Sequence, residues 1–187
     1  MTLGLGQIVH VVDFISSATY KVVPLSKTDP VQDLAIVKDP HLVKASPYGW
    51  HNGTETSTST QGNNARVYTV IHPGAKKYFT DGGKDLQFTP SPDFSKGPTE
   101  GANRDASVTN LFYGEFTIAF NFIHLVVNMM HDLAYAYGFT PSAGNFQNLN
   151  YGDPGKGGDG VIARAQDTSS VNDASFATVF LISALLI

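Results

Sequence analysis

A long stretch without proline most constrains how this chain can fold. Between Asp105 and Gly138 the only internal glycine is Gly114, and polar side chains recur at steps of three and four residues. That spacing places them on one stripe of an α-helix. They are Thr117, Asn121, His124, Asn128, His131 and Tyr135. The other positions are largely apolar, so the sequence predicts one long, buried helix with Gly138 as its C-terminal cap.

A membrane span is the competing interpretation of this stretch, because about 20 apolar residues can cross a bilayer. Glu115, Asn121, His124 and Asn128 lie inside the stretch and argue against a span. The net charge of −4, without a run of Lys or Arg, argues against nucleic acid or an anionic membrane surface as a partner. The chain has no cysteine, which excludes disulfides and thiolate metal sites.

The rest of the sequence predicts short strands separated by loops. Residues that favour strands cluster at 7–20, 20–25, 66–71, 161–165 and 175–180. Turn-forming pairs predict irregular structure over 27–62 and 73–103. The Ser/Thr-rich run 54–60 fits a loop or an exposed strand, and the glycine-rich run 152–160 fits a hairpin connection. The expected fold class is therefore α+β, rich in strands and loops, with one long helix.

The histidines do not have the spacing of metal ligands. His124 and His131 are seven residues apart, which is about 10 Å along a helix axis. Zinc ligands lie about 2 Å from the ion, so we expect both histidines to be hydrogen-bonded packing residues. His131 and Asp132 could form an imidazole–carboxylate pair, although neighbours in a helix point in different directions. Asp153 and Asp159 lack the ligand spacing of an EF-hand calcium loop.

Two further features bear on secretion. Asn52-Gly53-Thr54 is the single N-glycosylation acceptor in the sequence, which makes Asn52 a candidate glycan site. The segment from Met1 to Gln7 has neither the positive charge nor the long apolar run of a secretory signal. We therefore expect no signal peptide in this chain.

Several segments resemble, in order, those of the fungalysins, a family of secreted fungal zinc metallopeptidases of the M36 type. Residues 8–22 resemble the junction between propeptide and mature enzyme. The other segments are S-P-Y-G-W-H (46–51), Q-G-N-N (61–64), L-F-Y (111–113), M-H-D-L-A-Y-A-Y-G-F (130–139), A-G-N-F-Q (143–147), V-I-A-R-A-Q-D (161–167) and N-D-A-S-F-A-T (172–178). Gln61 and Arg164 stand where the family usually has arginine and asparagine. The resemblance covers nearly the whole chain.

The resemblance implies a secreted zinc endopeptidase made as a zymogen, with the N-terminal part of a thermolysin-like (gluzincin) catalytic domain. Residues 1–18 would end the propeptide and residues 19–178 would begin the catalytic domain, with maturation near Ala18 to Tyr20. The partners implied are protein or peptide substrates and the chain's own propeptide.

The resemblance also implies a substrate-binding edge strand. Asn172, Asp173 and Ala174 match it position by position, although Asp173 replaces an asparagine and an ionised carboxylate cannot donate a hydrogen bond. An ordinary strand with turn-type residues is the alternative for these three positions.

The chain departs from the family pattern in two places. Residues 114–127 are inserted before the His-Asp segment, and residues 179–187 form an apolar tail where the family continues differently. We interpret both as translated intron. A genuinely longer helix is the alternative for the first, because about 14 residues are nearly four helical turns. For the second, a buried strand or an exposed apolar tail are both open.

No H-E-x-x-H segment, the helical motif that holds zinc in such enzymes, occurs in the 187 residues. We therefore expect no catalytic and no metal-binding residues here, and an inactive, truncated family member whose zinc ligands are absent. The alternative is a non-catalytic fragment that binds a full-length peptidase or its prodomain.

Overall fold

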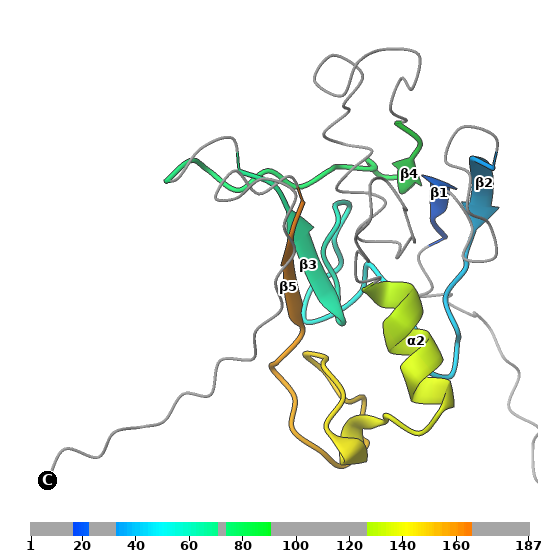
Figure 1. Cartoon of the computed structure of the whole chain (residues 1–187), viewed down its shortest axis with the longest axis vertical. Coiled ribbons are helices and arrows are strands. Elements are labelled where there is room, and N and C mark those ends of the chain that lie inside the picture. Colours follow the sequence, from blue (N-terminus) through cyan, green and yellow to red (C-terminus); the bar gives the residue numbers. More distant parts are fainter. Residues whose placement is uncertain (1–16, 23–32, 71–73, 91–126, 166–187) are drawn as a thin grey trace, which may run out of the picture.

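The computed structural model describes residues 17–22, 33–70, 74–90 and 127–165 (Figure 1). Its elements, in chain order, are β1 (Thr19–Val22), β2 (Ala35–Lys38), β3 (Ala65–Tyr68), β4 (Gln87–Phe88), α2 (Asn128–Ala136), the 3-10 helix η1 (Pro141–Ala143) and β5 (Val161–Arg164). Short strands with one α-helix among the described residues agree with a partial α+β domain. None of the helices in this part of the chain is long and apolar enough to cross a membrane.

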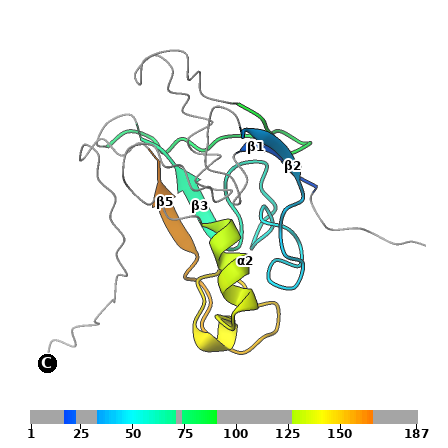
Figure 2. The same cartoon turned by 45° about the vertical axis from the view of Figure 1, so that its right-hand side comes forward.

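The strands form two small sheets. In the first, of order β2-β1-β4, β1 is antiparallel to β2 and parallel to β4. In the second, β3 and β5 are parallel, with Ala65 opposite Val161 and Tyr68 opposite Arg164. Figures 1 and 2 both show α2 beside the β3–β5 pair, with the loop of residues 140–160 below it. Residues distant in sequence thus meet around one end of α2.

The predicted strands at 66–71 and 161–165 are confirmed as β3 and β5, and the one at 20–25 overlaps β1. The irregular structure predicted for 27–62 is wrong at β2, and that for 73–103 is wrong at β4. Both strands are short and flanked by turns, and pairing with β1 stabilises them. Most of the predicted strands at 7–20 and 175–180 lies outside the described residues.

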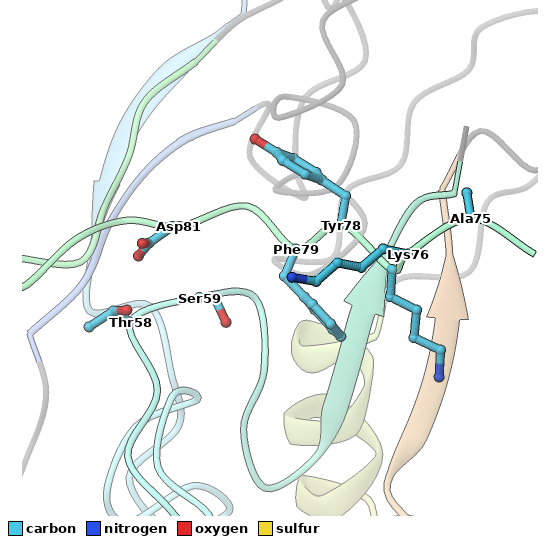
Figure 3. Close-up of a pocket in the computed structure, with 8 residues that line it drawn as sticks. Thr58, Ser59, Ala75, Lys76, Tyr78, Phe79 and Asp81 are labelled. Carbon is cyan, nitrogen blue, oxygen red and sulfur yellow. The ribbon is translucent and has the colours of Figure 1, made fainter. Parts of the chain in front are cut away.

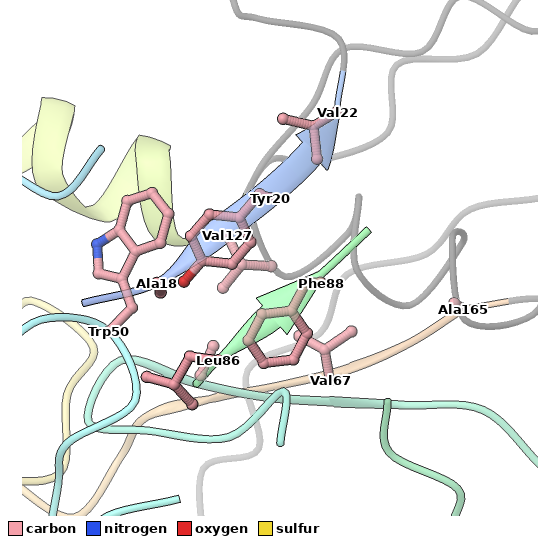
Figure 4. Close-up of a cluster of buried hydrophobic side chains, with 10 residues drawn as sticks. Ala18, Tyr20, Val22, Trp50, Val67, Leu86, Phe88, Val127 and Ala165 are labelled. Carbon is pink, nitrogen blue, oxygen red and sulfur yellow. The ribbon is translucent and has the colours of Figure 1, made fainter. Parts of the chain in front are cut away.

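An aromatic-rich core joins the first sheet to the second (Figure 4). The rings of Tyr20 and Phe88 stack with centroids 5.4 Å apart, and the His51 ring stacks on Phe88 at 4.7 Å with an interplanar angle of 3°. Trp50 lies against Tyr20 at 5.7 Å. The aliphatic residues of this core include Val22, Val67, Leu86 and Val127.

The described part of the predicted long helix, α2, ends as expected. Gly138 has φ +100°, its N–H donates to the Tyr135 carbonyl at 3.0 Å, and the Phe139 N–H donates to the Ala134 carbonyl at 2.9 Å. This pair of bonds is a Schellman motif, which needs a residue with positive φ. The prediction of Gly138 as the C-terminal cap is confirmed.

The described helix α2 buries polar side chains and leaves apolar ones exposed. Its buried residues are Asn128 and Asp132, whereas Met130 and Leu133 are 38% and 39% exposed. The polar stripe therefore faces the interior. The physical reason is that polar groups of two loops line the space that this face of the helix occupies.

Candidate functional site

The carboxylate of Asp132 is the centre of a buried hydrogen-bond network. Its Oδ2 accepts from the Leu42 backbone N–H at 2.8 Å and from Trp50 Nε1 at 2.9 Å. Its Oδ1 accepts from Ser46 Oγ at 2.8 Å and from His131 Nδ1 at 3.0 Å. Four donors match the acceptor capacity of a carboxylate, which is what its burial demands. They also connect α2 to a loop more than 80 residues earlier.

His131 is held at both ring nitrogens. While Nδ1 lies against Asp132, Nε2 lies 3.1 Å from Gln147 Oε1 and 3.3 Å from Asn145 Nδ2. The expectation of a hydrogen-bonded packing histidine is confirmed for His131. The imidazole–carboxylate pair of His131 and Asp132, which the sequence left open, is formed. Neighbours in a helix are rotated by about 100°, but the edge of an imidazole ring still reaches the adjacent carboxylate.

Two buried asparagines extend the network across the helix. Asn64 Nδ2 donates to Ser46 Oγ at 3.0 Å and to Asn128 Oδ1 at 3.2 Å. We call the connected set the Asp132 network. Its side chains are Ser46, Trp50, Asn64, Asn128, His131, Asp132, Asn145 and Gln147. A buried network of this kind stabilises one arrangement of its segments, provided that its members are satisfied.

A second buried histidine belongs to the aromatic core. His51 Nδ1 lies 2.8 Å from the Ser59 carbonyl oxygen, so this nitrogen carries the hydrogen, and Nε2 accepts from Tyr20 Oη at 2.7 Å. Burial penalises the charged ring and lowers the pKa of His51 to about 4, against a smaller opposing effect of the Ser59 carbonyl. His51 is therefore a neutral structural residue at pH 7.

His51 and His131 do not fit the role of zinc ligands. His51 and His131 each engage both ring nitrogens with protein partners, and a zinc ligand needs one nitrogen lone pair directed at the metal. Within residues 17–22, 33–70, 74–90 and 127–165, no three His, Cys, Asp or Glu side chains are grouped as a metal site would require.

A surface pocket of about 570 Å³ lies near the C-terminal end of β3 (Figure 3). It is lined by Thr58, Ser59, Ala75, Lys76, Lys77, Tyr78, Phe79 and Asp81. Beside it, Lys77 Nζ lies 4.8 Å from the centroid of the Tyr68 ring. No member of the Asp132 network lines this pocket, and its residues include no pair of an acid and a base in hydrogen-bond contact.

The predicted functional residues are only partly described. Asn172, Asp173 and Ala174, His124, most of the inserted segment and the apolar tail lie outside the described residues. Asn52 is half-buried, shortly before the exposed residues 54–56, and its Oδ1 accepts from Thr56 Oγ1 at 2.8 Å. Asp159 supports the network, because its Oδ1 accepts from the Gln147 backbone N–H at 3.2 Å.

Comparison with known proteins identifies the family to which this chain belongs. Residues 19–180 match the family model of the fungalysin metallopeptidases, M36. The chain belongs to the fungalysin family. It is 39% identical over 177 residues to extracellular metalloproteinase 1 of Arthroderma gypseum, and 38% identical over 177 residues to extracellular metalloproteinase 5 of Trichophyton rubrum. Each alignment covers 90% of this chain but 25% of the relative, so the chain spans about a quarter of their length.

The fungalysin-like segments converge on the Asp132 network. S-P-Y-G-W-H supplies Ser46 and Trp50, Q-G-N-N supplies Asn64, and the His-Asp segment supplies His131 and Asp132. Sequence reasoning missed this convergence. The signal available was the spacing of Asn128, His131 and Asp132, which puts three polar side chains on one helix face.

Proposed function

We propose that this fungalysin chain is the N-terminal part of the catalytic domain of an extracellular zinc endopeptidase, and that these 187 residues alone are inactive. The Asp132 network supports this proposal. It connects the family's segments through buried hydrogen bonds, and it leaves no histidine nitrogen within it for zinc. In this interpretation the fungalysin-like segments are structural, and the zinc ligands belong to a H-E-x-x-H segment that is not among these residues.

The outward face of α2 supports a place within a larger domain. Met130 and Leu133 are more than a third exposed, and Tyr137 beyond the helix is 87% exposed. Apolar groups gathered on one face mark a surface that packs against something else. In the proposed domain, the zinc-binding part of the enzyme packs against this face.

The expected biology follows from the family. The relatives are extracellular metalloproteinases of fungi, so we propose secretion, protein or peptide substrates, zinc as the cofactor and synthesis as a zymogen with residues 1–18 in the propeptide. When bound, zinc activates water and polarises the scissile carbonyl. Asn172, Asp173 and Ala174 are proposed to bind the substrate backbone, and Asn52 is proposed to carry a glycan.

A complementation experiment tests the proposal. The 187 residues are purified alone, and also fused to the zinc-binding remainder of the catalytic domain of a relative. We expect no zinc above background and no casein cleavage from the first, and both from the second. Zinc-dependent cleavage by the 187 residues alone would refute the assignment. In the fusion, Asp173→Asn is the matched variant for the substrate strand, and it should lower KM.

The alternative is a non-catalytic fragment that binds a full-length peptidase or its prodomain. The exposed face of α2 is the observation that favours it. A soluble, monodisperse chain that forms a complex with a full-length relative, and gives an inactive fusion, would support this alternative.

A further inference from the structure

A carboxylate is already placed at the start of β1, where the propeptide is proposed to end. The Ala18 backbone N–H donates to Asp39 Oδ1 at 2.7 Å, and Ser17 Oγ donates to Asp39 Oδ2 at 2.8 Å. The Asp39 backbone N–H donates in return to the Ala18 carbonyl at 3.0 Å. Both oxygens of one carboxylate thus hold two consecutive residues at this junction.

We propose that maturation cuts the Ser17–Ala18 peptide bond and that Asp39 then binds the new α-ammonium group of Ala18. This inference rests on the proposed zymogen, and it moves the end of its propeptide from residue 18 to residue 17. Hydrolysis consumes one water molecule and leaves a carboxylate on Ser17 and an ammonium group on Ala18. The Ala18 nitrogen, which donates to Asp39 Oδ1 as an amide, becomes a cation at the same place. Asp39 Oδ2 no longer accepts from Ser17 Oγ, so it can accept from another hydrogen of the ammonium group.

The packing of the junction selects this bond among its neighbours. Ser17 is exposed, whereas Ala18 is 4% exposed and belongs to the core. A cut one bond later, after Ala18, would remove that core residue and the carbonyl that accepts from Asp39. It would also place a charged end at the Thr19 nitrogen, which donates to the Leu86 carbonyl at 2.9 Å beside β4. Cleavage before Ala18 leaves β1 and its sheet intact.

The backbone conformation of Asp39 and its location after β2 bring its carboxylate to the start of β1. Its φ is +43°, a conformation that few residues other than Gly, Asn and Asp adopt easily. It directly follows β2, whose pairing with β1 places Lys38 opposite Thr19. The charged groups on the neighbouring segments are Lys21 on β1, Lys38 on β2, and Lys84 and Asp85 before β4.

The test uses the secreted protein that contains this chain. Mass spectrometry of its N-terminus should find Ala18, and any other first residue would overturn the proposal. The α-amine is then labelled with a limiting acylating reagent across pH 6–10. The fitted pKa of the amine should exceed the usual value of about 7.7–8.0, because the carboxylate favours its charged form.

Variants separate a specific ion pair from general electrostatics. Asp39→Asn keeps the shape of the side chain, and asparagine tolerates positive φ. Without the carboxylate the amine pKa falls, so labelling at pH 7 should become about three- to tenfold faster. Asp85→Asn removes a carboxylate from a neighbouring loop and should leave the rate unchanged. Equal rates in the wild type and Asp39→Asn, or an equal effect of Asp85→Asn, would overturn the role of Asp39. An unperturbed amine pKa in the wild type would do so even if Asp39→Asn fails to fold.

These readouts do not depend on catalysis. Failure of the zinc and casein experiment would leave the first residue and the amine pKa measurable. Conversely, an active peptidase that begins at another residue would refute this inference while the proposed function stands.

Discussion

Acidification should destabilise this fold through one buried histidine. The unfolded chain has the ordinary His51 pKa of 6.5, and burial lowers it to about 4 in the folded chain. Between these values the unfolded state binds more protons, so the free energy of unfolding falls as the pH falls. At 1.36 kcal/mol per pKa unit, His51 alone costs about 2 kcal/mol between pH 7.5 and 5, and about 3 kcal/mol by pH 4. Above about pH 7.5 its contribution is nearly constant.

The assay is urea unfolding followed by the fluorescence of Trp50. It is the single tryptophan of the chain, it is 2% exposed, and it contacts the same core as His51. With a slope of about 2 kcal/mol per molar urea, a loss of about 2 kcal/mol shifts the midpoint by about 1 M. Other groups titrate in the same range, so the wild type is compared with His51→Gln at each pH.

The variant decides whether the reasoning holds. His51→Gln is less stable at pH 7.5, because the core loses a stacked ring, but it should lose about 2 kcal/mol less than the wild type on going to pH 5. If the two proteins lose equal stability between pH 7.5 and 5, the neutral buried state of His51 is wrong. Losses below pH 4 that are equal in the two proteins come from carboxylates, which both share.

Five further substitutions at four positions probe the backbone and the network, each measured as a free energy of unfolding. Asp132→Ala leaves four buried donors without their acceptor and should cost about 3–5 kcal/mol, whereas Asp153→Ala in an exposed turn should stay within about 0.5 kcal/mol. Gly62→Ala would place a Cβ 1.6 Å from the Trp50 carbonyl oxygen, so we expect a loss of about 3 kcal/mol or more; a stable variant would contradict that close approach. Gly138→Ala puts a side chain at φ +100° and should cost about 1–2 kcal/mol, and Gly138→Asn should cost less, because asparagine tolerates positive φ better.

Local patterns predicted what local interactions determine. Clusters of strand-favouring residues identified β3 and β5, and Gly138 marked the end of α2. These features depend on residues within one turn or one strand of each other. The residues of β2, by contrast, are Ala35-Ile-Val-Lys38, a run too short to distinguish from the surrounding turns without its partner β1.

The Asp132 network could not be predicted in the same way, because its bonds join residues distant in sequence. Asp132 reaches Leu42 and Trp50 across separations of 90 and 82 residues. A helical stripe of polar residues can face solvent or buried partners, and the sequence of the helix alone does not distinguish the two. The resemblance to the fungalysins named the segments involved, but it did not show that they meet.

The network also explains why α2 has its polar residues on the inside. Hydrogen bonds are directional, so Asn128, His131 and Asp132 fix the rotation of the helix. Their partners are Asn64 and the loops at 42–50 and 145–147. Apolar contacts are not directional and tolerate many orientations. A helix fixed on one side by hydrogen bonds can therefore present Met130 and Leu133 in a defined position on the other. In a fungalysin domain of which this chain is a part, that arrangement would set the geometry of packing before the apolar face is covered.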